Sequence, residues 1–254
     1  MRRLVLKVGS AVLTQDGSLA LNRLKNLVEL IALLKKRYEV ILVSSGAVAA
    51  GYSLLNLNKK IVANKQTLAA LGQPLLMDTY RKKLLKHDIL CSQVLLEATI
   101  FDDKKRLNHA QDAIAVMLNN DILPIINEND VTATEELVFG DNDQLSAYVT
   151  KFFSADLLVI FTDIDGYYDK NPHEHSDAKL QKTIQKINQQ SLREEDSANS
   201  EFATGGIVTK LKAADFLLKN NKKMFLTTGF DLNCAHEFLL NENQINGTLF
   251  EGKS

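Results

Sequence analysis

The sequence predicts an α/β protein in which an open, mainly parallel β-sheet is sandwiched between helices, giving three α/β/α layers. Short apolar runs alternate with helical patterns along almost the whole chain, and strands separated by helices pair in parallel through right-handed crossovers. Glycine-rich and polar clusters follow several of the apolar runs, at the sheet edge where such folds bind ligands. We expect residues 1–254 to form one domain.

The strands are predicted from runs of Val, Ile and Leu, as expected where helices cover both faces of a parallel sheet. These runs are 4–8, 39–43, 89–96, 122–126, 157–162 and 223–227.

The helices are predicted where apolar residues recur every three or four positions, as they do from Leu24 to Leu34. The other helical segments are 65–85, 106–119, 143–153, 209–218 and 231–240. The polar stretch 173–200 is expected to be a surface excursion that contains some helix.

Composition limits the class of protein. With 45% hydrophobic and 24% charged residues, the chain is typical of globular proteins, and its net charge of −1 favours neither a nucleic-acid partner nor an anionic membrane surface. No apolar stretch is long enough to span a bilayer, and Lys7 interrupts the one N-terminal run that resembles a signal peptide. Cys91 and Cys234 are expected to be buried thiols in a reducing compartment, so we expect a cytoplasmic protein.

Two glycine–lysine segments stand near opposite ends of the chain. Lys7 interrupts an apolar strand and precedes Gly9 and Ser10, while residues 204–210 open a predicted helix and end in Lys210. Glycines let backbone N–H groups approach phosphate oxygens, and a helix N-terminus adds partial positive charge. An edge strand or a side chain that extends to the surface would also explain Lys7, but Gly9 and Ser10 directly after it favour a phosphate contact. Together the segments favour a kinase, because lysines suit a phosphoryl group in transfer.

Small and polar residues lie between these segments. Residues 44–51 offer either N–H groups for an anionic ligand or small side chains for a close helix–sheet contact, and the sequence does not decide between them. Residues 127–130 and 140–143, rich in Asn and Asp, flank a predicted β-hairpin at 131–139. Such residues are common in turns, but two such clusters also suit a polar substrate with an ammonium group.

Other ligand motifs are incomplete or absent. Asp163 and Asp165 resemble a fragment of a calcium loop, without its full spacing or terminal glutamate. His173 and His175 have no cysteine nearby, which favours a solvated loop over a metal site. Neither the Rossmann fingerprint nor the P-loop occurs.

The order and spacing of these segments resemble the amino acid kinase family over essentially the whole chain, and within it the members that phosphorylate glutamate. The resemblance implies that the N-terminal part holds the amino acid and that about 155–254 holds the nucleotide. The segments that carry it are 6–10, 44–51, 65–73, 127–130, 140–147, 158–163 and 204–210.

The resemblance also implies roles for individual residues. Lys7 and Lys210 correspond to the two lysines that flank the transferred phosphoryl group, and Asp143 orients them, with Asp141 as a weaker candidate. The amino acid is expected to contact Ser45, Asn127, Asp130 and Asn142. The nucleotide is expected to contact Lys7, Gly9, Thr162, Asp163, Thr204, Gly205, Gly206, Ile207, Val208, Thr209 and Lys210. ATP and Mg²⁺ are the implied cofactors, with Mg²⁺ held through ATP phosphates rather than by protein ligands.

The implied reaction moves the γ-phosphoryl group of ATP to the side-chain carboxylate of L-glutamate, giving L-glutamyl 5-phosphate, the first step of proline synthesis. A carboxylate is already nucleophilic at neutral pH, so no general base is needed. The resemblance further implies feedback inhibition by proline, a homo-oligomer (dimer or tetramer), and a glutamyl-phosphate reductase that takes up the product.

Two departures from the family pattern are Ala203, where the family often has glycine, and the C-terminal PUA domain of many such members, which we do not expect here. Two alternatives stay open. The same fold could serve aspartate, N-acetylglutamate, carbamate or a nucleoside monophosphate as acceptor, or the chain could be an amino-acid-binding regulator without catalysis.

Overall fold

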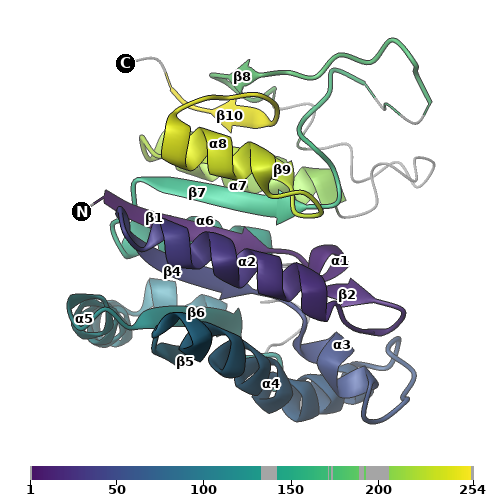
Figure 1. Cartoon of the computed structure of the whole chain (residues 1–254), viewed down its shortest axis with the longest axis vertical. Coiled ribbons are helices and arrows are strands. Elements are labelled where there is room, and N and C mark those ends of the chain that lie inside the picture. The colour runs from purple at the N-terminus through teal and green to yellow at the C-terminus, as the bar shows by residue number, and fades with distance from the viewer. Residues whose placement is uncertain are drawn as a thin grey trace.

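The computed structural model describes residues 2–132, 142–170, 172, 174–188, 192 and 206–252. An eight-stranded sheet in the order β5-β6-β4-β1-β7-β9-β10-β8 runs through the molecule between two layers of helices (Figure 1). The predicted α/β/α fold is confirmed. The strands are β1 (Arg2–Val8), β4 (Tyr38–Ser44), β5 (Cys91–Leu96), β6 (Leu123–Glu128), β7 (Leu157–Thr162), β8 (Thr183–Ile184), β9 (Lys223–Thr228) and β10 (Thr248–Phe250).

The long helices form the two outer layers. They are α2 (Leu21–Leu34), α4 (Val62–Leu84), α5 (Lys104–Asn119), α6 (Asn142–Phe152), α7 (Gly206–Lys219) and α8 (Asn233–Asn241). Shorter elements are α1 (Ser10–Leu13), the hairpin β2 (Thr14–Gln15) and β3 (Ser18–Leu19), α3 (Ala47–Tyr52), and two 3₁₀ turns, η1 (Leu85–His87) and η2 (Ala98–Asp102).

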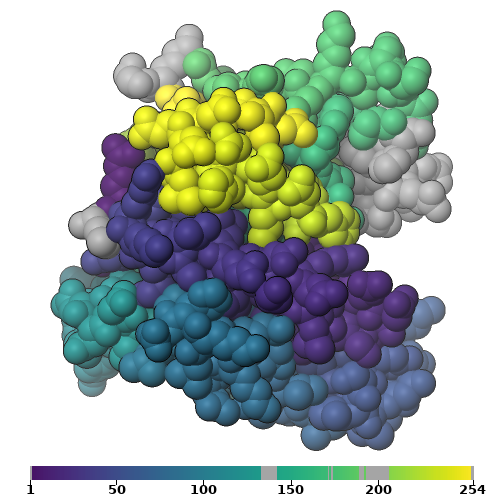
Figure 2. Space-filling view, viewed as in Figure 1, coloured from purple at the N-terminus to yellow at the C-terminus, as the bar shows by residue number. Residues whose placement is uncertain are grey.

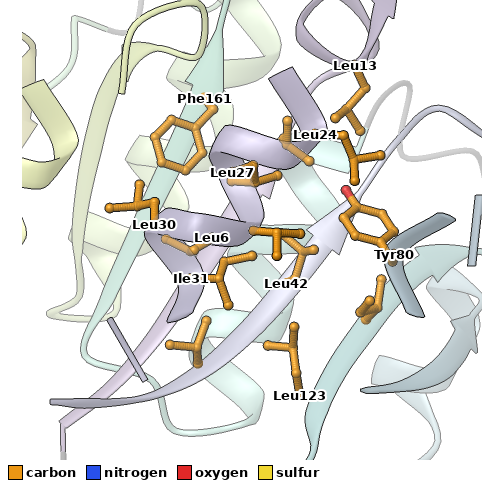
Figure 3. Close-up of a cluster of buried hydrophobic side chains, with 14 of the residues drawn as sticks. Leu6, Leu13, Leu24, Leu27, Leu30, Ile31, Leu42, Tyr80, Leu123 and Phe161 are labelled. Atoms are coloured by element: carbon orange, nitrogen blue, oxygen red, sulfur yellow. The ribbon is translucent and has the colours of Figure 1, made fainter. Parts of the chain in front are cut away.

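Alternation along the strands divides the core into two clusters. Leu4 and Leu6 of β1 face α2, α4 and α8, whereas Val5 faces α5, α6 and α7. Figure 3 shows part of the first cluster, where Ile31 of α2 lies close to Leu6. The space-filling view shows α8, α2 and α4 side by side over this face of the sheet (Figure 2). Because helices cover both faces of the sheet, nearly all residues of its central strands are apolar.

Strand β1 marks the point where the strand order reverses. It pairs in parallel with β4 on one edge and with β7 on the other. In open α/β sheets a ligand binds beyond the carboxyl ends of the strands at this switch point. Lys7 lies at that end of β1 and is only 3% exposed. An edge strand or a side chain that extends to the surface is therefore excluded for Lys7.

All six predicted strands and six predicted helices are present, with ends shifted by a few residues. The sequence prediction missed β8 and β10, and β10 runs antiparallel to β9. Within residues 174–188 of the expected excursion the structure has β8 and no helix. Most of residues 189–200 lie outside the described residues, so the helix expected in this stretch stays a prediction. Residues 133–139 of the predicted hairpin lie outside the described residues.

Both cysteines are free, as expected, but only Cys234 is fully buried. Cys91 is half-buried because it begins β5, the edge strand, so the expectation of a core thiol was wrong there. Burial raises the pKa of the Cys91 thiol above its usual value. No helix among the described residues is long and apolar enough to cross a membrane.

The close packing of α3 against α4 explains the small residues that follow β4. A Cβ atom on Gly72 would lie 1.8 Å from the carbonyl oxygen of Ala47, and one on Gly51 would lie 1.9 Å from that of Leu68. The backbones of the two helices therefore touch directly. The sequence had suggested a contact between a helix and the sheet, whereas the structure has a contact between two helices.

We expect Gly72→Ala to destabilise the protein by about 3 kcal/mol, because α3 and α4 must move apart and overpacked sites relax poorly. Chemical denaturation of both proteins measures this difference. Gly206→Ala is the matched control, since a Cβ atom there meets nothing within 4 Å. Equal stability of Gly72→Ala and the wild type would contradict the helix contact.

Candidate active site

The carboxyl ends of β1, β4, β6 and β7 meet at one edge of the sheet, beside α1 and α3 at the right of Figure 1. Parallel pairing brings these ends together because neighbouring strands run in the same direction. The loops beyond them carry most of the residues predicted for the site, which fall into three groups: a charged cluster, a small polar pocket and a glycine-containing rim.

Three of the predicted residues form the lysine–aspartate cluster: Lys7, Asp143 and Lys210. Oδ1 of Asp143 lies 2.5 Å from Nζ of Lys7, and its Oδ2 lies 3.0 Å from Nζ of Lys210. The Asp143 side chain has no exposed surface, and both lysine side chains are nearly buried. Because a buried charge without a partner is costly, Asp143 holds the two ammonium groups in place from one central position.

Each member of this cluster comes from a different element. Lys7 is the last residue but one of β1, Asp143 lies in the first turn of α6, and Lys210 lies near the beginning of α7. Nζ of Lys210 also donates to the carbonyl oxygen of Gly206 at 2.7 Å, and Oγ1 of Thr209 donates to Oδ2 of Asp143 at 3.0 Å. The beginning of α7 is thereby fixed to the beginning of α6.

A small polar pocket of about 150 Å³ lies next to this cluster. It contains all four residues predicted to contact the amino acid. Its lining is Ser10, Ser45, Gly46, Ala47, Val48, Ala49, Lys65, Asn127, Glu128, Asp130 and Asn142. Gly46 has a φ of +108°, which a glycine adopts without strain, and it turns the chain from β4 into α3.

Amide side chains connect the walls of the pocket. Nδ2 of Asn142 donates to Oδ1 of Asn127 at 2.8 Å and to Oγ of Ser45 at 3.1 Å. Asn127 is nearly buried at the end of β6, and Asn142 begins α6. Asn142 therefore touches the pocket, while the next residue, Asp143, touches both lysines.

Asp130 gives one side of the pocket its charge. Burial raises the pKa of this carboxyl above its usual 3.8, and the positive charge of Lys65 opposes that shift. Lys65 is exposed on α4 and also lines the pocket. The pocket thus offers a carboxylate to an ammonium group and an ammonium group to a carboxylate, which are the two charges of a free amino acid.

The glycine-containing rim adjoins the cluster, since a Cβ atom on Gly9 would lie 3.5 Å from Nζ of Lys7. The Gly9 N–H donates to the carbonyl oxygen of Phe161 at 3.1 Å, which ties the end of β1 to β7. Oγ1 of Thr162 donates to Oδ1 of Asp163 at 2.8 Å. Gly206 begins α7 with open space at its Cα, and the N-terminus of this helix favours negative charge.

The other predicted residues of the rim differ in what they can offer. The Val208 side chain is buried in the core, and the Ile207 side chain packs against that core. What these two residues can offer to a ligand is therefore their backbone N–H groups. Thr204 and Gly205 lie outside the described residues, as do Gly140 and Asp141. Among the residues that the structure describes, no group of three or more His, Cys, Asp or Glu side chains is arranged to hold a metal ion.

A larger cavity lies at the opposite end of the strands. It measures about 620 Å³ and is lined by Arg2, Arg3, Lys222 and Lys223 among others. No predicted site residue borders it. We place the site at the smaller pocket because the buried charges and the reversal of strand order coincide there.

Sequence reasoning missed several residues of the pocket. Glu128 and Gly46 line it, and Gln73 of α4 accepts a hydrogen bond from Nδ2 of Asn127 at 3.0 Å. Lys65 and Gln73 belong to a segment that carried the resemblance, but no role followed from it. Their pattern on a helix is that of ordinary polar residues, so only the tertiary structure identifies them.

Comparison with known proteins identifies the family of this chain. The model of the amino acid kinase family matches residues 2–228. The chain belongs to the amino acid kinase family. A glutamate 5-kinase from Wolinella succinogenes is 53% identical over 255 residues, covering 98% of both chains. A glutamate 5-kinase from Leishmania donovani is 50% identical over 250 residues, covering 98% of this chain and 95% of that one.

Solved structures of other amino acid kinase fold proteins share the architecture at low identity. Isopentenyl phosphate kinase from T. acidophilum superposes with a TM-score of 0.66 at 15% identity, covering 98% of this chain and all of the other. UMP kinase from Ureaplasma parvum gives a TM-score of 0.66 at 16% identity, covering 98% of both chains. At such identities the likeness establishes the fold alone.

Proposed function

We propose that this chain transfers the γ-phosphoryl group of ATP to the side-chain carboxylate of L-glutamate, giving L-glutamyl 5-phosphate. One observation carries the proposal: Asn142 and Asp143, consecutive at the start of α6, contact the small pocket and the two lysines respectively. The acceptor site and the charges for a phosphoryl group are thereby held together by one helix. The relatives named glutamate 5-kinase support the choice of acceptor.

In this proposal the amino acid occupies the small pocket. Asp130 binds the ammonium group, Ser45 binds a carboxylate, and Asn127 and Asn142 shape the pocket through their hydrogen bonds. An acceptor that carries a phosphate is disfavoured, since Asp130 and Glu128 would repel it. This charge pattern supports a free amino acid over a nucleoside monophosphate.

The chemical step requires placement and charge more than proton transfer. An oxygen of the glutamate side-chain carboxylate forms a bond to the γ-phosphorus as the bond from that phosphorus to the β–γ bridging oxygen breaks, leaving ADP. No proton needs to move, because the carboxylate is ionised at neutral pH. Lys7 and Lys210 neutralise the charge that spreads over the transferred group. Mg²⁺ held by the ATP phosphates would add further positive charge.

The nucleotide is placed along the rim. Gly9, Thr162, Asp163 and the residues from Thr204 to Lys210 are its proposed contacts, with Lys7 shared between the rim and the acceptor. The proposal treats 1–254 as one domain whose part from about 155–254 holds ATP. Proline inhibition, a dimer or tetramer, transfer of the product to a glutamyl-phosphate reductase, and a cytoplasmic location remain proposals.

The test is a hydroxylamine assay for acyl phosphate with ATP, Mg²⁺ and three rival acceptors: L-glutamate, L-aspartate and N-acetyl-L-glutamate. Selective hydroxamate formation from L-glutamate would support the proposal. Product from another acceptor would keep the reaction class and overturn the substrate. No product from folded protein would overturn the enzyme.

The pKa of Asp130 gives a pH prediction. Because burial raises this pKa, Asp130 takes up its proton at a higher pH than an ordinary aspartate and then no longer attracts an ammonium group. The KM for glutamate should therefore rise as the pH falls through the raised pKa, with less change in the KM for ATP. In Asp130→Asn the KM should be high throughout, with this pH dependence removed. An acid-side increase that persists in Asp130→Asn would contradict the assignment.

A further inference from the structure

A row of four amide side chains runs from the small pocket to the edge of the sheet. Asn142 donates to Asn127 as described above, Nδ2 of Asn127 donates to Oε1 of Gln73 at 3.0 Å, and Nε2 of Gln73 donates to Oε1 of Gln93 at 3.2 Å. We call these four residues the amide chain. Its members lie, in order, on α6 (Asn142), β6 (Asn127), α4 (Gln73) and β5 (Gln93).

One backbone group sets the direction of the whole amide chain. The N–H of Glu128 can only donate, and it lies 2.9 Å from Oδ1 of Asn127. This contact fixes which end of the Asn127 amide is the oxygen, so its nitrogen must face Gln73. The same reasoning then orients Gln73, whose nitrogen must face Gln93.

The contact of Glu128 with Asn127 also determines the orientation of the Asn142 amide. Because Oδ1 of Asn127 is an acceptor, the group of Asn142 that faces it must be the Nδ2 donor, and Ser45 receives a bond from the same nitrogen. The carbonyl oxygen of Asn142 is left as the acceptor of that side chain. This oxygen can accept a hydrogen bond from an ammonium group. If the Asn142 amide were flipped, its NH₂ group would take the place of the oxygen and could not accept such a bond.

The proposed reaction uses neither Gln93 nor Gln73 of the amide chain, and of these two only Gln73 is buried. It is 8% exposed, and it lies on α4 rather than in the pocket of Ser45, Asn127, Asp130 and Asn142. A buried polar group is costly unless it is hydrogen-bonded, and Gln73 makes one bond as acceptor and one as donor. Its carbonyl oxygen is the described partner of the Asn127 nitrogen.

We propose that Gln73 is a positioning residue for the amino acid: together with the Glu128 N–H, which binds the oxygen end of the Asn127 amide, it binds the nitrogen end and so holds that amide in the orientation that makes Asn142 an acceptor toward the ammonium group. This inference rests on the proposed function. It concerns binding of the acceptor, because Gln73 touches neither the lysines nor the rim in the described structure. The KM and Kd for the amino acid should therefore change, while kcat and the KM for ATP stay near their wild-type values.

The test compares three variants. Gln73→Met keeps the length of the side chain but removes the acceptor, and should weaken acceptor binding roughly tenfold, the upper range for one hydrogen bond. Gln73→Glu restores an acceptor oxygen for Asn127. A glutamate cannot donate to Gln93, but Gln93 is exposed and can turn its amide to donate instead. Binding should therefore return toward the wild-type value. Gln111→Met is the control, since Gln111 is a half-buried glutamine on α5 with one hydrogen bond, to Phe152.

The Kd by calorimetry and the KM are measured for L-glutamate, L-aspartate and N-acetyl-L-glutamate, so that the inference does not depend on turnover. A wild-type preference for another acceptor would overturn the proposed substrate, and the variants would then be compared with that acceptor. Unchanged affinity in Gln73→Met, or equal losses in Gln73→Met and Gln111→Met, would overturn the role of Gln73. No binding of any acceptor by the wild type would overturn both.

Discussion

Lys210→Met should lower kcat by about 10²–10³-fold, the usual effect of removing one preorganised group that stabilises developing charge. The physical reason is the position of Lys210, which shares Asp143 with Lys7 at the junction of the pocket and the rim. Methionine keeps the apolar stem of the side chain and removes the charge. The KM for glutamate should change little, since Lys210 does not line the small pocket.

The variant should remain folded, because Asp143 keeps Lys7 as a partner and is not left as an unpaired buried carboxylate. Steady-state kinetics and thermal unfolding separate the two effects. Lys219→Met is the matched control on the same helix, where an exposed lysine pairs with Asp215 at the surface and such pairs contribute little. A folded Lys210→Met enzyme with wild-type kcat would remove Lys210 from the mechanism.

Asp143→Asn should lower kcat at least as far as Lys210→Met and should also destabilise the fold by about 3–5 kcal/mol, as expected when a buried ion pair loses one partner. The change leaves two ammonium groups together without an anion between them. Asparagine has nearly the same shape, so packing stays the same and the loss reports charge. Kinetics and denaturant unfolding measure the two losses.

The loss of stability in Asp143→Asn should depend on pH. An unpaired buried lysine has a lowered pKa, so the unfolded chain binds more protons than the folded one between the two pKa values. Stability then rises with pH in that range, and the deficit should shrink under alkaline conditions as the lysines become neutral. Asp215→Asn is the control, and a deficit that is equal for both variants or independent of pH would contradict the charge argument.

The sheet could be predicted from the sequence because its buried strands are short, continuous runs of apolar residues, a pattern that is typical of strands covered on both faces. The strands that escaped prediction, β8 and β10, are two and three residues long and carry no periodic pattern. Helix α3 escaped for another reason. Its Ala- and Gly-rich sequence has no apolar stripe, and its place is set by backbone contact with α4.

For the site, residue types predicted the chemistry better than they predicted which side chains contact one another. Lysines and glycines after strands indicated phosphate, and the resemblance assigned Asp143 to the two lysines. No spacing along the chain predicts that Lys7 and Lys210 lie on either side of one carboxylate, because that depends on which strands become neighbours. Gln73 was beyond sequence reasoning, since a glutamine on a helix is usually exposed.

The central place of β1 also has a consequence for how the protein folds. Its first edge can pair with β4 early, but its second edge waits for β7, since Leu4 pairs with Leu157. During synthesis an apolar strand edge therefore stays open until more than half of the chain has emerged. Pairings between distant residues slow folding, and open strand edges promote aggregation. We expect slow refolding and a need for chaperones that the compact native state does not reveal.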